Sequence, residues 1–267
     1  MFSPNRLSCT VACASLFLSA SILLTGCGEP VNPSANTVNV TGNWQISSSA
    51  PAAGKLPALS GEFTGTSASL TGILHSDSAS SCIAPTTAVE VIGSTSQGIT
   101  TVTGANVAGG TLTISGTLAA NGKSFSNATY NVTGGTCAFA TPATGVTAQD
   151  YSPITGNYMG SFSDPSGQVI TVTATLTQSP ASDADGNFTL SGTGTFPSNP
   201  CFDSPITVSN TQVTGGSFTL TYADSTTTNS VTASGTFSTD GTTLTVANWT
   251  LTGPCGPDSG TGLLTKQ

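Results

Sequence analysis

Apolar and polar residues alternate along the chain beyond residue 37 with a period of two, and no helical period is found there. In residues 112–118, 170–176 and 218–222, apolar residues or glycine occupy every second position and Thr or Ser fills the others. Successive side chains of a strand point to opposite faces, so each run predicts a strand with one buried face and one hydroxyl-rich face. The pattern therefore predicts an all-β fold.

Short turn sequences separate these runs. Asn121-Gly122, Asp185-Gly186 and Asp240-Gly241 are pairs that supply the positive φ angles of tight hairpins. The segment 183–187 has some likeness to a calcium loop, but it lacks the full ligand spacing, and we interpret it as a turn. Successive hairpins, with about seven to nine strands in each half, favour antiparallel meander barrels, because closure removes exposed strand edges. Two β-sandwiches are the alternative.

The second half of the chain repeats the first. Thr41-Gly42-Asn43-Trp44 recurs as Thr155-Gly156-Asn157-Tyr158, and Ser115-Gly116-Thr117 recurs as Ser234-Gly235-Thr236. Further matches, among them residues 70–72 with residues 190–192, occur in the same order at offsets between 114 and 120 residues. We therefore expect two tandem β repeats, residues 38–150 and 151–267.

The cysteines fit this duplication. Of seven cysteines, four lie in the repeats, and each repeat holds two of them at matching positions. The economical pairing is Cys82–Cys137 and Cys201–Cys255, which gives each repeat one disulfide. A zinc site is the rival interpretation, but the chain has no CxxC pair and a single histidine. We expect no metal and no cofactor.

The N-terminal segment has the form of an export signal. A short positively charged start, residues 1–6, precedes an apolar run, residues 7–24, and the sequence Leu24-Thr25-Gly26-Cys27 follows. This motif resembles the lipobox of bacterial lipoproteins. The resemblance implies a signal peptide of residues 1–26, a tether of residues 27–37, and diacylglycerol on the Cys27 sulfur, usually with a further acyl chain such as palmitate on its amine.

The same resemblance implies a location. The protein is expected in the bacterial cell envelope, held to the membrane by the lipid on Cys27. Gly28 in place of Asp at the next position favours the outer membrane, with the periplasmic or surface face left open. A plain secreted protein and an uncleaved membrane anchor are the alternatives.

The TGNW motif at the start of the first repeat resembles the GxW start of lipocalin-like β-barrels, and its counterpart in the second repeat is TGNY. Gly42 and Trp44 carry the resemblance in the first copy, and Gly156 and Tyr158 carry it in the second. The segment 199–202 also looks like repeats in lipoproteins of soil bacteria. The lipocalin likeness implies carriage of a small apolar ligand, which requires small inward residues to leave a cavity. Gly116, Ala174, Gly192, Ala233 and Gly235 are the candidates. Glycines in strands equally mark bends that close a small, filled barrel, which is the alternative.

Each repeat holds one Trp and one Tyr at two matching positions, and the two residue types are interchanged between the copies. Trp44 aligns with Tyr158, and Tyr130 aligns with Trp249. The strands that carry each pair are expected to be neighbours in a closed sheet, with the rings plugging the core. Their alternative role is a stacking platform for a sugar ring, which makes a surface glycan a possible partner.

The net charge and the few residues suited to catalysis limit the classes of function that the protein can have. Charged residues make up 6% of the chain, and loss of Arg6 with the leader takes the net charge from −8 to −9, which excludes nucleic-acid binding. The single histidine, His75, is expected in a solvated loop, and its counterpart in the second repeat is Thr195. Glu62 and Glu90 leave a glycosidase-type acid pair open.

These features predict a protein that is not an enzyme. The expected function is a non-enzymatic structural, adhesive or binding role in the envelope. A carrier of a small apolar ligand is the alternative, and a hydrolase is a remote third.

Overall fold

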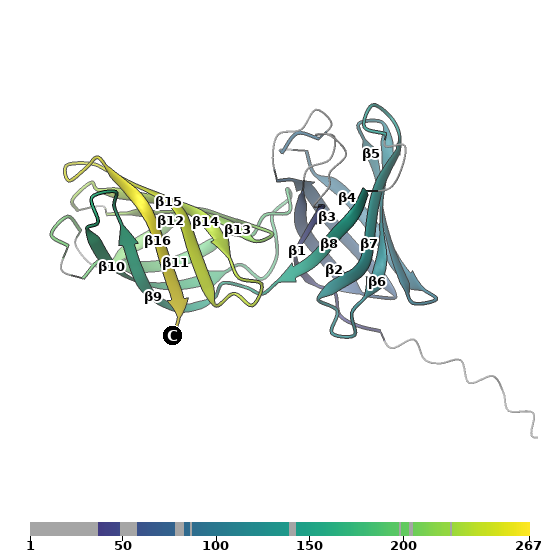
Figure 1. Ribbon diagram of the computed structural model, residues 1–267, viewed down its shortest axis with the longest axis horizontal. Coiled ribbons are helices and arrows are strands. Elements are labelled where there is room, and N and C mark those ends of the chain that lie inside the picture. The colour runs from purple at the N-terminus through teal and green to yellow at the C-terminus, as the bar shows by residue number, and fades with distance from the viewer. Residues whose placement is uncertain are drawn as a thin grey trace, which may run out of the picture. The chain divides into compact units, whose positions relative to one another are not determined.

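The computed structural model describes residues 37–48, 58–77, 83–85, 87–138, 143–197, 199–202, 205–224 and 226–267. The strands close into two tandem antiparallel barrels of eight strands each (Figure 1). This confirms the all-β prediction and selects meander barrels over sandwiches. The leader, Cys27 and residues 28–36 of the predicted tether lie outside the described residues.

Each barrel is formed by strands in sequence order. The first consists of β1 (Gly42–Ser48), β2 (Leu59–Thr66), β3 (Ser69–Ser76), β4 (Val89–Ser96), β5 (Ile99–Val107), β6 (Gly110–Leu118), β7 (Ser124–Gly134) and β8 (Ala143–Tyr151). The second consists of β9 (Gly156–Ser163), β10 (Val169–Gln178), β11 (Leu190–Thr195), β12 (Ile206–Thr214), β13 (Ser217–Ala223), β14 (Ser230–Phe237), β15 (Thr243–Thr252) and β16 (Asp258–Lys266). Pairing of β1 with β8 and of β9 with β16 closes the two sheets.

The matched sequence segments occupy equivalent strands. Residues 70–72 lie in β3 and residues 190–192 in β11, and residues 115–117 and 234–236 lie in β6 and β14. The predicted turn at 183–187 is also present, because the Asp183 carboxylate accepts hydrogen bonds from the N–H groups of Asp185 and Asn187. Local turn chemistry and the duplication therefore set the same strand order twice.

The aromatic residues singled out in the sequence lie inside the barrels. Trp44, Tyr130, Tyr158 and Trp249 are all at most 1% exposed and belong to the two hydrophobic cores. The expectation that their strands are neighbours is wrong, because β8 lies between β7 and β1, and β16 lies between β15 and β9. Meander closure always inserts the last strand between the penultimate strand and the first.

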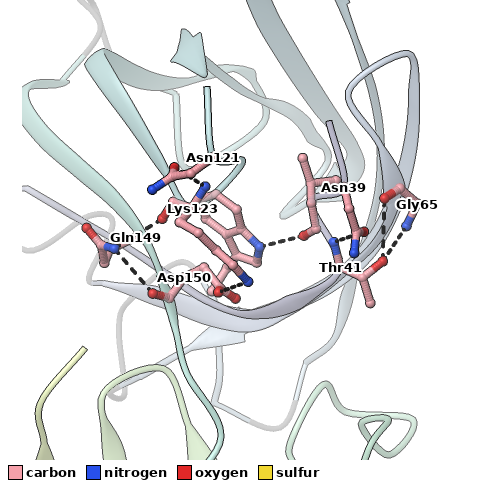
Figure 2. Close-up of polar contacts among 9 residues, drawn as sticks. Asn39, Thr41, Gly65, Asn121, Lys123, Gln149 and Asp150 are labelled. Atoms are coloured by element: carbon pink, nitrogen blue, oxygen red, sulfur yellow. Dashed lines mark hydrogen bonds and ion pairs between the residues drawn. The ribbon is translucent and has the colours of Figure 1, made fainter. Parts of the chain in front are cut away.

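One end of the first barrel holds an ion pair between an exposed lysine and a buried carboxylate. Lys123 Nζ lies 2.6 Å from Asp150 Oδ2, and the Asp150 side chain is 2% exposed (Figure 2). Burial raises the pKa of Asp150, while the hydrogen bond and the charge of Lys123 act in the opposite direction. A methyl group at Gly42 would overlap the Asp150 carboxylate. The glycine of the first TGNW motif is therefore required by this carboxylate.

The small residues that a ligand cavity would require lie in the strands of the two barrels. A methyl group at Gly192 would overlap the carbonyl of Thr175, and one at Gly235 would overlap the carbonyl of Thr245. These glycines mark places where neighbouring strands approach closely. The two alanines of the expected set, Ala174 and Ala233, are core residues.

One predicted disulfide lies within the described residues. Cys201 and Cys255 are bonded, with their α-carbons 5.8 Å apart. Asn229 supports the bridge, because its amide donates to the Cys201 carbonyl at 2.6 Å and its Oδ1 accepts from the Cys255 N–H at 3.1 Å. Cys82 lies outside the described residues, so its pairing with Cys137 stays a prediction.

Candidate functional site

A row of polar residues on the outer face of the first barrel is buried. Asn43 flanks the inward-pointing Trp44, so its side chain belongs to the outer face of β1, yet Asn43 is 2% exposed. In the strand register Gln45 lies opposite Ser60 and Ser60 lies opposite His75. Ser60 is 0% exposed and His75 is 4% exposed. Outer faces of such sheets are normally solvated, so this row has a cover.

The second barrel covers the row with two turns. Gly215, between β12 and β13, donates its N–H to Asn43 Oδ1 at 2.9 Å and accepts from Asn43 Nδ2 at 2.8 Å. A methyl group on Gly215 would lie 2.5 Å from Ser60 Oγ, and one on Gly186 would lie 3.4 Å from His75 Nδ1. Glycines with positive φ at both positions let the turns approach the strands this closely.

The expectation that His75 lies in a solvated loop is wrong. The structure places His75 in β3, opposite Ser60 and beneath the turn at Gly186. Its Nδ1 is buried and has no hydrogen-bond partner within the described residues. A buried polar atom without a partner is uncommon in folded proteins. Sequence reasoning missed this placement because the covering turns come from the other repeat.

Asp77 follows His75 by two residues and lies beside the same surface. It keeps an exposed surface, but the enclosure of its carboxyl group raises the pKa of Asp77, while contacts with Ser60 and Gln45 and the charge of His75 act against this. Gln45 Nε2 donates to Asp77 Oδ2 at 2.8 Å, and the Tyr151 hydroxyl donates to Gln45 Oε1 at 3.2 Å. A hydrogen-bonded series from Tyr151 through Gln45 therefore orients the carboxylate.

A pocket of about 270 Å³ opens beside these groups. His75, Ser76, Asp77 and Pro85 line it from the first barrel, and the β12–β13 hairpin lines it with residues between Gln212 and Thr219. Pockets for small organic ligands usually measure about 300–1,000 Å³. This pocket therefore suits a small molecule and presents it to one imidazole and one carboxyl group.

The row does not form a nucleophilic serine site. Ser60 is fully buried, so its hydroxyl cannot attack a substrate in the pocket. The groups that line the pocket and exchange protons are His75 and Asp77. The chemistry that these side chains supply is general acid–base catalysis.

The two glutamates do not converge on this pocket. Glu62 and Glu90 lie opposite Ile73 from the two neighbouring strands, which places their α-carbons about 10 Å apart at the usual strand spacing. Glu62 Oε2 accepts hydrogen bonds from the N–H and the hydroxyl of Ser182, at 3.1 and 2.6 Å. Glu62 is thus engaged with the loop between β10 and β11.

Replacement of Asp77 by Asn tests the electrostatics of the site. A raised folded-state pKa means that the ionised carboxylate destabilises the fold, so stability falls as pH rises from the unfolded pKa towards the folded one. Asp77→Asn is expected to raise the melting temperature by about 1–2 °C at pH 7, since exposed substitutions change stability by about 0.5 kcal/mol. The gain should vanish below about pH 3.8, where both states are protonated. Calorimetry of the wild type and the variant across this range measures it, and a gain that grows as pH falls would contradict the sign.

No family model matches the chain, and no curated protein matches it. A solved structure that matches is kievitone hydratase from Nectria haematococca, with 11% identity, 85% of this chain and 88% of that chain covered, and a TM-score of 0.23.

The matched chain is an enzyme, and this contradicts the non-enzymatic role that the sequence led us to expect. At this TM-score the likeness carries nothing further, so neither its reaction nor its substrate transfers to the present chain. The expectation of a non-enzymatic protein also relied on His75 being a solvated loop residue, and the burial of His75 contradicts this.

Proposed function

We propose that the protein is an enzyme whose active site is the pocket beside His75 and Asp77. His75 acts as the general base that removes a proton from a small substrate. Asp77, oriented by Gln45, acts as the general acid that protonates the departing or developing anion. The reaction class is proton transfer coupled to bond cleavage, addition or isomerisation.

The observation that carries this proposal is the placement at one pocket of two groups: an imidazole whose buried Nδ1 has no partner within the described residues, and a carboxyl group of raised pKa. Asp77 directly follows the end of β3, and two residues of extended chain span at most about 7 Å, so one small molecule can contact both side chains. Environments that shift the pKa of a carboxyl group, as this one raises the pKa of Asp77, are typical of acid–base sites.

The test uses 5-nitrobenzisoxazole, a small uncharged probe for a general base. A base removes its ring C–H proton, the C–H electrons form a nitrile, the N–O bond breaks, and the oxygen leaves as a coloured phenolate. The purified full-length protein should open this ring faster than buffer of the same pH. His75→Gln should lower the rate by about 100-fold, because general acid–base groups contribute about 10²–10⁴-fold. Asp77→Asn should lower it by less, about tenfold, because the weakly basic nitrophenolate leaves with little need of a proton.

The matched control is Asp240→Asn, which changes an exposed aspartate in a turn of the second barrel. Its rate should equal that of the wild type. A His75→Gln variant that is folded and as active as the wild type would contradict the proposal. Absence of turnover by the wild-type protein would contradict it as well.

We also propose that the enzyme is exported and lipid-anchored in the bacterial envelope. The support is the sequence around Cys27 and its resemblance to a lipobox. The described residues contain no helix with the length and apolar character needed to cross a membrane. Cys27→Ser should move the protein from the membrane fraction to the soluble fraction, and its mass should lack acyl chains. An unchanged distribution and mass would argue against lipidation of Cys27.

A further inference from the structure

Asn43 and Asn157 occupy the same position of the repeated TGN motif, but they make different contacts. Asn157 Oδ1 accepts a hydrogen bond from the Thr175 hydroxyl at 2.9 Å, within the second barrel and at its surface. Asn43 pairs both polar atoms of its amide with the backbone of Gly215, 172 residues away. The first copy alone holds the other barrel in this way, among the residues that the structure describes.

The turn that Asn43 holds continues directly into the pocket wall. Gly215 connects β12 to β13, and the pocket residues of the second barrel, from Gln212 to Thr219, flank this glycine on both sides. A shift of the turn away from β1 would therefore carry the wall away from His75. The same shift would open the pocket that His75 lines, and Gly186, which approaches His75 Nδ1, belongs to the same barrel as this turn.

The contact is built for close approach. Gly215 has a φ of +51°, and a methyl group on it would lie 2.5 Å from Ser60 Oγ and 2.8 Å from Gln45 Cβ. A methyl group on the next residue, Gly216, would lie 2.6 Å from the Tyr151 ring. Both glycines are needed for the turn to lie against the strands that carry the site.

We infer that Asn43 is a positioning residue that completes the active site by fixing the β12–β13 turn over β1–β3. Its amide makes the hydrogen bonds that water would otherwise make with the Gly215 N–H and carbonyl. As a result, the pocket is closed around His75. The catalytic part of this inference rests on the function proposed above, whereas the closure of the pocket stands independently of it.

The closure is tested by the accessibility of His75, the single histidine of the chain. Diethyl pyrocarbonate acylates imidazole nitrogens, and mass spectrometry of the modified protein reports the rate. Wild-type His75 should react slowly, because it is 4% exposed. Asn43→Ala should increase the rate roughly tenfold, as expected for the loss of hydrogen bonds that hold the covering turn. Asn157→Ala, the matched control in the other repeat, should react at the wild-type rate.

A second variant reaches the same contact from the other barrel. Gly215→Ala places a methyl group against Ser60 and Gln45, and it should expose His75 as Asn43→Ala does. Because both changes break one contact, the double variant should show less than the product of the two single effects. Circular dichroism of every variant establishes that both barrels remain folded.

The same variants separate the role of Asn43 from the role of the pocket. With 5-nitrobenzisoxazole, Asn43→Ala should raise KM more than it lowers kcat, while His75→Gln lowers kcat. Equal His75 reactivity in the wild type, Asn43→Ala and Asn157→Ala would overturn the inference. Faster modification of Asn43→Ala with no probe turnover by any form would leave the closure established and overturn the catalytic role of the pocket.

Discussion

Replacement of Cys201 and Cys255 by serine is expected to lower the free energy of unfolding of the second barrel by about 4 kcal/mol. The bridge spans 54 residues of sequence, and the entropy model for a loop of this length gives that magnitude. Cys255 is exposed and Cys201 half-buried, so the serine side chains themselves add little cost. Urea unfolding followed by the fluorescence of Trp249, which lies in the second barrel, measures the change when Trp44 is replaced by Phe in both proteins.

The reduced wild-type protein is the control for this experiment. Reduction should lower the unfolding midpoint to that of the double-serine variant, because both lack the same cross-link. A double-serine variant within about 1 kcal/mol of the oxidised protein would show that the unfolded chain gains little freedom from the loss of the bridge. Asn229 would then be the principal link between the two segments.

The strands could be predicted from the sequence because their determinants are local. Alternation at 112–118 places Leu112 and Ile114 in the core of the first barrel, and the pair Asn121-Gly122 provides the turn that follows. The pairing of Cys201 with Cys255 followed from the duplication, which supplied a second example of the same spacing. Each of these features depends on residues close in sequence or on a repeated pattern.

The candidate site could not be predicted because its cover comes from the other repeat. Asn43 and Asn157 stand in identical motifs, and only long-range packing decides that the first is buried against Gly215. The same packing buries Ser60 and His75, which lie on the outer face of β2 and β3. The Gly215-Gly216 pair was a weak sequence signal of this cover. A hairpin turn does not need two glycines, and the pair permits close approach to a second surface.

The way in which the sheet closes explains why the strands that carry Trp44 and Tyr130 were wrongly expected to be neighbours. Trp44 and Tyr130 mark the first and penultimate strands, and periodicity alone does not say which strands meet when the sheet closes. In the structure β8 pairs with both β7 and β1, so the two rings face the core from strands that do not touch. Trp44 instead packs on Phe63 and Phe125, with ring centroids 5.2 and 5.3 Å away.

Replacement of Trp44 by Ala is expected to lower the free energy of unfolding of the first barrel by about 3–5 kcal/mol. The indole is 0% exposed, and its Nε1 donates to the Val40 carbonyl at 2.8 Å, so the change removes both core volume and a buried hydrogen bond. Trp44→Phe keeps most of the volume and leaves the carbonyl without its donor, at a cost of about 1–3 kcal/mol.

Urea unfolding followed by circular dichroism measures these differences, and Trp249 fluorescence reports the second barrel separately in both variants. Because the two barrels have separate hydrophobic cores, the Trp249 transition should shift less than the transition of the first barrel. Equal stability of the Ala and Phe variants would show that the volume of Trp44 contributes nothing to the core. An equal shift of both transitions would instead show that the contacts around Asn43 make the two barrels unfold as one unit.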